Sequence, residues 1–291
     1  MMKIGITGAE GFVGSHLSRF LGKKPDISVE CFDRNRFDLG RPDTLVEFVR
    51  GKDCIIHLAS IIIGSQEEMW INEYGTYNLI QAIRETDQKR VKFIFISTAQ
   101  VYGYSDETSF LDEDSELNPA NFHAYSKIIC ERTALLFKDL IEPIILRLTN
   151  VYGFGCRPHY NSAMATFLDR IDRGERIILN NGGRQERDFL YVRDACEIIY
   201  RFVVKKNCSH RIYNVTTGRL VEIKDLVDLI SSYLSRKAIV EYRPIDEPVN
   251  RSVISNKRML EEVGPFNFTE LEAGLKEYID EYKESTGYQS G

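Results

Sequence analysis

Three glycines after the first apolar run constrain the fold of this chain more than any other feature. Residues 4–7 are apolar, and Gly8, Gly11 and Gly14 then recur at a spacing of three before an amphipathic stretch. Such a turn brings bare backbone against a phosphate group, whose charge is stabilised by the amides and the positive end of the next helix. It also occurs as a plain connection between a strand and a helix, and its place after an N-terminal strand favours a dinucleotide site.

Apolar runs and helical patterns alternate through the first half of the chain. The near-continuous apolarity of these runs is typical of parallel strands that are covered on both faces. The alternation predicts an α/β fold with a Rossmann-like, doubly wound parallel sheet. The predicted strands are residues 4–7, 29–32, 54–58, 91–97 and 144–148, and the predicted helices are 13–21, 43–50, 67–84 and 124–137.

The second half of the chain is less regular. A length of 291 residues fits either one two-part α/β unit or two small domains. Because no repeat or linker separates the halves, we expect a smaller C-terminal lobe folded against the first part. The predicted elements are helices at 163–173, 192–205 and 223–234, strands at 177–179 and 212–215, and a turn at 181–183.

Charge and cysteine usage exclude several classes of protein. The 38 basic and 43 acidic residues give a net charge of -5 without a basic block, so nucleic acid is not an expected partner. The six cysteines are scattered, which argues against a metal site or a disulfide framework. The chain starts directly with a strand and has no apolar run of about 18 residues, so we expect a cytoplasmic protein without a membrane partner.

The end of the second predicted strand carries the charges that would meet a dinucleotide. Asp33 lies about twenty residues beyond the glycines, where an acid can accept hydrogen bonds from the adenosine ribose. Arg34 either stacks on the adenine, pairs with a 2′-phosphate, or is a solvated arginine in a loop that also holds Arg36. The expected cofactor is NADP or NAD, with NADPH preferred if Arg34 meets the phosphate.

Further motifs follow in a fixed order. Residues 96–103 end in Val101-Tyr102-Gly103, Lys127 follows His123 by four residues, and residues 187–194 read Arg-Asp-Phe-Leu-Tyr-Val-Arg-Asp. In this combination the chain resembles the extended short-chain dehydrogenase/reductase family of nucleotide-sugar epimerases, dehydratases and reductases. The hallmark of that family is a Tyr-x-x-x-Lys pair on one helix. Here His123 stands in the place of the tyrosine.

The resemblance implies where each ligand binds. Residues 1–155, with 186–216 returning to them, would form the dinucleotide-binding domain, and 156–185 with 217–291 the substrate-binding lobe. Helices 67–84 and 124–137 would form the face of a homodimer, while Gly75 and Asn78 would serve packing. The implied cofactor residues are Gly8, Gly11, Phe12, Val13, Gly14, Asp33, Arg34, Asp38, Leu39, Leu58, Ala59, Ser60, Asn72 and Lys127. The implied substrate residues are Thr98, Asn150, Arg187 and Arg251, and the two arginines would pair with a diphosphate or form structural ion pairs.

The departure from the family pattern decides the chemistry. By resemblance Thr98 hydrogen-bonds the reacting sugar oxygen and Lys127 holds the nicotinamide ribose, so the implied catalytic residues are Thr98, His123 and Lys127. An imidazole can donate a proton near neutral pH, although Lys127 would push His123 toward its neutral form. Alternatively His123 only fills space, and water or Thr98 passes the proton. Tyr125 is a rival donor, but two residues along a helix point it roughly the opposite way.

These residues favour the NAD(P)H-dependent reduction of a nucleotide-linked keto-sugar, a 4-keto-6-deoxyhexose, for deoxysugar or polysaccharide precursors. Ala99 and Gln100 stand where the dehydratases carry an Asp-Glu pair, so a dehydratase is not expected. A reductase needs only a proton donor, whereas an NAD-dependent nucleotide-sugar 4-epimerase, the first alternative, needs His123 as a base. The second alternative is a non-catalytic dinucleotide-binding sensor or scaffold, which would not require Thr98 and Lys127. His16 and His57 are expected to be buried and hydrogen-bonded.

Overall fold

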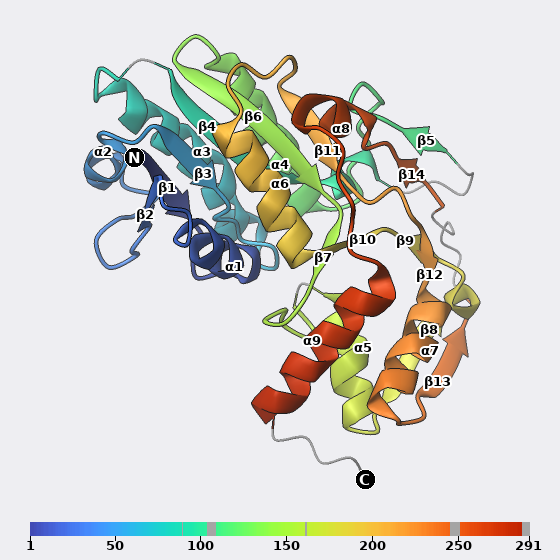
Figure 1. Ribbon diagram of the computed structural model, residues 1–291. Helices are drawn as coiled ribbons and strands as arrows, with labels where there is room; N and C mark the ends of the chain where they lie inside the picture. Colours follow the sequence, from blue (N-terminus) through green and yellow to red (C-terminus); the bar gives the residue numbers. More distant parts are fainter. Residues whose placement is uncertain (89, 104–108, 161, 245–250, 287–291) are drawn as a thin grey trace.

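The centre of the molecule is a six-stranded parallel sheet. A computed structural model of the chain describes residues 1–88, 90–103, 109–160, 162–244 and 251–286. The strand order is β11-β6-β4-β3-β1-β2 (Figure 1). These strands are β1 (Met2–Thr7), β2 (Ile27–Cys31), β3 (Cys54–His57), β4 (Val91–Thr98), β6 (Ile141–Leu148) and β11 (Ile212–Val215). The predicted doubly wound α/β fold is confirmed.

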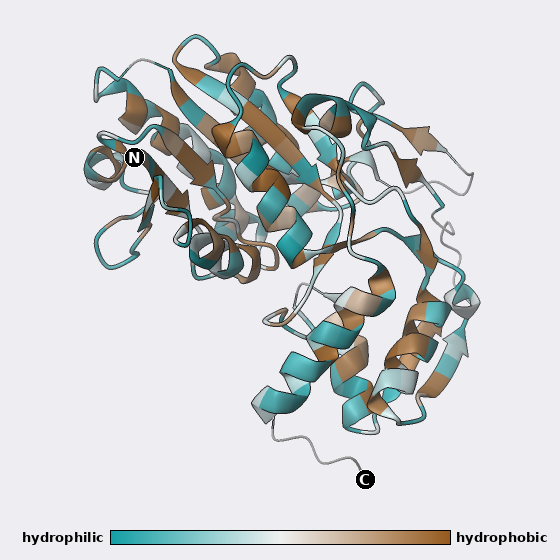
Figure 2. Ribbon diagram, viewed as in Figure 1, coloured by the Kyte–Doolittle hydropathy of each residue, from teal (hydrophilic) through white to brown (hydrophobic). Residues whose placement is uncertain are grey.

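Helices cover both faces of this sheet. Residues of β4 alternate between the two cores: Ile94 and Ile96 join the core under α1 and α6, and Phe93 and Phe95 join the core under α2, α3 and α4. Hydrophobic residues are accordingly concentrated in the strands (Figure 2). No helix in the described ranges is long and apolar enough to cross a membrane. The helices are α1 (Phe12–Leu21), α2 (Pro42–Val49), α3 (Gln66–Arg84), α4 (Phe122–Leu136) and α6 (Val192–Val204).

Strand β6 is three residues longer than predicted because a proline is tolerated inside it. The predicted strand began at residue 144, after Pro143, and a proline cannot donate to a sheet hydrogen bond. In the structure the Ile145 N–H donates to the Arg211 carbonyl (2.7 Å), at the start of β11. The nitrogen of Pro143 points to the same side, where β11 has not yet begun, because its first paired residue is Ile212 opposite Ile145. No hydrogen bond is therefore lost.

The C-terminal lobe lies below the central sheet in Figure 1. Helices α5 (Ala163–Asp172), α7 (Ile223–Leu234) and α9 (Leu271–Thr286) pack beside a parallel pair of strands, β8 (Arg176–Asn180) and β13 (Ile239–Arg243), while α8 (Lys257–Val263) packs against β11. The turn predicted at 181–183 is the 3-10 turn η2 (Asn181–Gly183). Several short elements were not predicted, because two to four residues show no periodicity. They are η1 (Ala99–Tyr102), β5 (Phe110–Leu111), β7 (Asn150–Tyr152), β9 (Glu186–Arg187), β10 (Phe189–Tyr191), β12 (Val221–Glu222) and β14 (Val253–Ile254).

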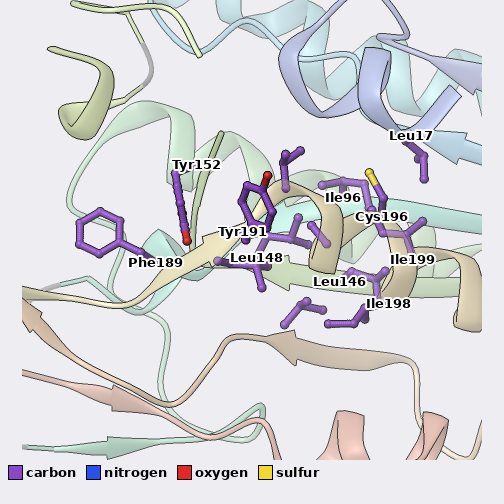
Figure 3. Packing of buried hydrophobic residues seen from close by; sticks show 14 of the residues in the cluster. Leu17, Ile96, Leu146, Leu148, Tyr152, Phe189, Tyr191, Cys196, Ile198 and Ile199 are labelled. Carbon is purple, nitrogen blue, oxygen red and sulfur yellow. The ribbon is translucent and has the colours of Figure 1, made fainter. Parts of the chain in front are cut away.

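One hydrophobic core connects the sheet to the lobe. Leu146 and Leu148 of β6 lie in the same cluster as Tyr152 and Tyr191 (Figure 3). Leu275 of α9 belongs to this cluster as well. Tyr152 is 1% exposed and Tyr191 is 4% exposed, and their ring centroids are 5.3 Å apart. The two parts of the chain are therefore held together by packing rather than by a linker.

Candidate active site

A cavity of about 820 Å³ opens at the carboxyl edge of the central sheet. From β1 the chain crosses to β2 on one side, whereas β3 lies on the other side of β1, so the strand order reverses at this point. Ligands of doubly wound sheets bind at such a reversal. The wall brings together the ends of β1, β3, β4 and β6 with α4. It contains every predicted site residue except Asp33 and Arg251.

The glycine turn forms one end of the cavity and fits a diphosphate. Gly8 has φ +71°, and a Cβ on it would lie 2.6 Å from the Ala59 nitrogen; a Cβ on Gly14 would lie 2.1 Å from the Gly8 carbonyl oxygen. Both positions therefore require glycine. Gly11 is the N-cap of α1, and no side chain caps the first turn of that helix. The backbone amides of the first turn of α1 therefore remain available to a ligand, as dinucleotide binding requires.

Arg34 lines the cavity and Asp33 does not. The Asp33 carboxylate faces its own loop, where Oδ1 accepts hydrogen bonds from Asn35 N (2.9 Å) and Asn35 Nδ2 (3.0 Å). Arg36 pairs with Glu47 (2.5 Å). Within the described ranges Arg34 has neither an ion pair nor a hydrogen bond. It is the charged group of this loop that remains available to a ligand, and the role of Asp33 stays a prediction.

The loop at Asp38 and Leu39 is held against α3. A Cβ on Gly75 would lie 3.0 Å from Leu39 Cβ, and Asn78 Nδ2 donates to the Leu39 carbonyl (2.8 Å). The Asp38 carboxylate accepts from the Gly40 amide (2.8 Å). Gly75 and Asn78 thus place Leu39 in the cavity wall through packing and backbone support.

Asn72 lies in the wall with its side-chain amide already engaged. Oδ1 accepts from the Ile61 amide (2.7 Å), and Nδ2 donates to the Ile61 carbonyl (2.9 Å) and to Ser126 Oγ (3.3 Å). Asn72 therefore shapes the segment of Leu58, Ala59 and Ser60 along the cavity, and a cofactor contact would come in addition to these three bonds.

The two other histidines of interest are hydrogen-bonded inside the fold. Thr7 Oγ1 donates to His57 Nδ1 (2.6 Å), and His57 Nε2 donates to Thr76 Oγ1 (3.0 Å). Burial, together with the charge of Lys127, lowers the pKa of His57 to about 3, so the ring is neutral. His16 Nε2 donates to the Phe154 carbonyl (2.8 Å). Neither ring lines the cavity.

Thr98, His123 and Lys127 share the opposite part of the wall. Lys127 is 5% exposed and Nζ donates to the Ile96 carbonyl (2.9 Å). Burial lowers the pKa of Lys127 to about 8. Thr98 Oγ1 accepts from the Gln100 amide (3.2 Å), which leaves the hydroxyl proton available to a ligand.

His123 is the polar group of the cavity whose environment is incomplete. Both of its ring nitrogens are shielded from solvent and have no hydrogen-bond partner within the described ranges. Burial, and then the charge of Lys127, lowers the pKa of His123 to about 4. Buried polar groups are normally paired, so the unpaired imidazole is a candidate for contact with a ligand or a water molecule. Tyr125, the rival donor, is 51% exposed and lies outside the wall, as the helical offset predicted.

The two residues that follow β4 are Ala99 and Gln100, so neither of the positions where the dehydratases carry an Asp-Glu pair holds a carboxylate. Gln100 lines the cavity, and its Oε1 accepts from Asn121 Nδ2 (3.2 Å) of the α4 N-cap. Asp188 also reaches the wall, but its carboxylate is occupied by the hydroxyls of Thr149 (2.9 Å), Thr216 (2.8 Å) and Thr217 (2.7 Å). These acids and amides organise loops and leave proton transfer to other groups.

The substrate end extends into a second, smaller cavity. Asn150 and Arg187 line both the main cavity and one of about 200 Å³ in the lobe, between α5 and β8. Asn150 Nδ2 donates to the Asp188 carbonyl (2.9 Å), and Arg187 Nη1 to the Glu186 carbonyl (2.8 Å). Arg251 is exposed and lines neither cavity, although its neighbour Ser252 does. A substrate contact by Arg251 stays a prediction.

Among the wall residues that sequence reasoning missed, two carry polar side chains from the lobe-side loop after β7. Arg157 and Tyr160 lie in the loop after β7, and the Arg157 guanidinium is 5.8 Å from the centre of the Tyr160 ring. The bond from His16 to the Phe154 carbonyl ties this loop to α1. Their place in a loop that follows a strand end at the carboxyl edge of the sheet was the signal that could have identified them.

Comparison with known proteins places the chain among nucleotide-sugar enzymes. The profile of the NAD dependent epimerase/dehydratase family matches residues 4–216. The GDP-6-deoxy-D-talose 4-dehydrogenase of Aggregatibacter actinomycetemcomitans is 24% identical over 287 residues, which are 95% of this chain and 96% of that protein. The UDP-glucuronic acid 4-epimerase of Bacillus cereus, solved with UDP-glucuronic acid and NAD, gives a TM-score of 0.86 at 23% identity, covering 98% of this chain and 100% of the other. RMD from Pseudomonas aeruginosa, solved with NADPH, gives 0.85 at 23% identity with the same coverage.

Proposed function

Because the chain belongs to the NAD dependent epimerase/dehydratase family, we propose that it is an NAD(P)H-dependent reductase of a nucleotide-linked keto-sugar, namely a 4-keto-6-deoxyhexose used for deoxysugar or polysaccharide precursors. The observation that carries the proposal is the unpaired His123 imidazole, which lines the same cavity as Thr98 and Lys127. The relative named a GDP-6-deoxy-D-talose 4-dehydrogenase supports a 6-deoxy sugar and chemistry at carbon 4.

Each side chain has one role in this reaction. The bound reduced cofactor would supply the hydride to the carbonyl carbon. Thr98 donates a hydrogen bond to the ketone oxygen, and Lys127 holds the ribose and keeps the local potential positive. His123, once protonated, delivers a proton to the same oxygen, so that the ketone becomes an alcohol. A proton donor placed this way contributes about 10² to 10⁴ in rate.

The two candidate reactions place different demands on His123. An epimerase must begin by removing a proton from an alcohol, and a base whose pKa is about 4 does this poorly. A reductase needs the conjugate acid, which is a strong donor but is carried by only about one His123 in 10³ at pH 7. The alternative, an NAD-dependent 4-epimerase, is supported by the likeness to the UDP-glucuronic acid 4-epimerase of Bacillus cereus but not by this property of the cavity.

The loop after β2 supports NADPH as the preferred cofactor. Arg34 lines the wall and has no ion pair within the described ranges, while the Asp33 carboxylate is bonded to Asn35. A guanidinium attracts a 2′-phosphate, whereas an acid facing the ribose would repel it. The structure of RMD with NADPH is a precedent for this cofactor on the same fold.

The proposal is tested with a panel of nucleotide-linked 4-keto-6-deoxyhexoses, each incubated with NADPH or NADH while the absorbance band of the reduced nicotinamide is followed. A reductase consumes the cofactor in proportion to the ketone. An epimerase interconverts two sugar nucleotides without net consumption of the cofactor. A sensor or scaffold binds the cofactor but converts neither the cofactor nor a sugar nucleotide. Either of the last two results would replace the proposed function.

A homodimer through α3 and α4 is part of the proposal. These helices pack against each other, and Trp70, Tyr74 and Tyr77 of α3 are each 46–47% exposed at spacings that place them on one face. Leu136 of α4 is 76% exposed. Such an apolar patch favours burial against a second copy. In analytical ultracentrifugation the unsubstituted protein should sediment as a dimer. The Trp70→Glu variant should sediment as a monomer.

A further inference from the structure

A buried ion pair lies directly behind the candidate active site. Glu131 of α4 and Arg147 of β6 are each 1% exposed. The Glu131 carboxylate accepts from Arg147 Nε (3.0 Å) and Arg147 Nη2 (2.6 Å), and also from Ser97 Oγ (2.5 Å). A guanidinium that meets a carboxylate with two parallel hydrogen bonds fixes direction as well as distance.

The partners of this pair flank Thr98. Ser97 immediately precedes Thr98 on β4 and is the register partner of Arg147 on β6. On the other side of Thr98, Arg147 Nη1 donates to the hydroxyl of Tyr102 (2.8 Å), in the turn η1. The segment that presents Thr98 to the cavity is thus held at both ends by the same ion pair.

The pair also holds the helix that carries the other reacting groups. His123, Lys127 and Glu131 follow one another at intervals of four residues on α4, so they form one stripe along the helix. Glu131 is bonded to β4 and β6, and Lys127 to the Ile96 carbonyl of β4. These bonds oppose rotation or sliding of the helix against the sheet.

Stability alone is a weak reason to bury two charges here. Desolvation offsets much of their attraction, and apolar residues of similar volume often serve as well. We propose that Glu131 and Arg147 are positioning residues, which set the placement of His123 and Lys127 relative to Thr98. The kinetic part of this inference rests on the proposed function.

The test replaces the three polar groups together, as Ser97→Ala, Glu131→Leu and Arg147→Met. Removing both charges avoids the unpaired charge that a single substitution would leave and keeps the net charge of the site unchanged. We expect a folded protein with kcat lowered by about 10²-fold, the loss that a displacement near 1 Å can cause. KM should change much less.

The control is a second cluster of a serine, an acid and a base, which lies away from the cavity and in which Glu262 is buried but Lys205 is 38% exposed. Glu262 of α8 accepts from Ser209 Oγ and lies 3.3 Å from the Lys205 amine. The substitutions Ser209→Ala, Glu262→Leu and Lys205→Met should change the melting temperature without changing kcat per folded molecule. If both triple variants lose activity only in proportion to the fraction unfolded, the Glu131–Arg147 pair has no positioning role.

A readout that needs no substrate separates this inference from the proposed reaction. The ring proton signals of His123, assigned by their loss in His123→Phe, report its pKa by NMR. Displacement of α4 should move that pKa by one unit or more toward the ordinary value of about 6.5. An unchanged His123 titration in a folded triple variant, with unchanged kcat where turnover exists, overturns the inference.

Should the triple variant not fold, Tyr102→Phe removes one arm and leaves the ion pair in place. The Tyr102 hydroxyl accepts from Arg147 and donates to Asn214 Oδ1 (2.7 Å). Its loss should lower kcat severalfold with NADPH affinity unchanged. A Tyr102→Phe enzyme with the kcat of the unsubstituted protein also contradicts the positioning role.

Discussion

His123→Phe is the substitution that most directly tests the chemistry. Phenylalanine has a similar planar ring and adds no charge, so the packing of α4 should be kept while the proton donor is removed. With a pKa of about 4, about one His123 in 10³ is protonated at pH 7, and this fraction falls tenfold for each further pH unit. The reductase should therefore lose about 10²-fold in kcat/KM between pH 6 and pH 8.

The variant should change both the size and the shape of this profile. We expect kcat to fall by about 10² to 10⁴ and the dependence on pH to become flat, because the titrating donor has gone. The assay is the initial rate of NADPH consumption from pH 5.5 to 8.5. Tyr125→Phe, two residues along the same helix but outside the cavity, is the matched control and should leave the profile unchanged. If His123→Phe retains the turnover and slope of the unsubstituted enzyme, His123 fills space, and water or Thr98 supplies the proton.

Three further predictions concern the cofactor and the fold. Gly11→Leu should abolish NADPH binding in a calorimeter while the circular dichroism spectrum is kept. A Cβ there would lie 3.1 Å from the Gly8 carbonyl oxygen, which a small shift of the turn relieves, whereas the larger side chain meets the diphosphate. Arg34→Ala should lower the NADPH-to-NADH ratio of kcat/KM by about tenfold, the lower end for a hydrogen bond to a charged group at an exposed site; an unchanged ratio makes it a surface charge. Below pH 6.5 His57 takes up a proton in the unfolded chain, but it does not do so in the folded protein, where its pKa is about 3. The free energy of unfolding should therefore decrease as the pH is lowered, by about 2 kcal/mol at pH 5. Urea denaturation of His57→Asn should lack this component.

The local parts of the site could be predicted from the sequence. The glycine turn, and the spacing of His123 and Lys127 on one helix, depend on contacts between near neighbours in the chain. Lys127 also matches a family motif, which predicted its place at the cofactor site from the sequence alone. For these residues a regular period and a known turn geometry are sufficient.

The rest depends on contacts between distant parts of the chain. Arg157 reaches the cavity because His16, from the first helix, holds its loop through the Phe154 carbonyl, and no local pattern reports that bond. Asp33 had the right position after β2, but the side chain of Asn35 competes for its carboxylate. Whether a polar side chain faces a ligand or its own backbone is decided by such competition.

The pairing of β11 with β6, and the packing of α6 against α1, restrict how this chain could be divided into smaller pieces. A recombinant fragment ending at residue 155 would retain the glycine turn, but it would lack Ile198 and Phe202, which share a core with Leu17 of α1. It would also expose the whole edge of β6, and an unprotected edge invites aggregation. A minimal cofactor-binding module therefore has to include the chain through β11, and two separately produced halves should regain solubility only when they are refolded together.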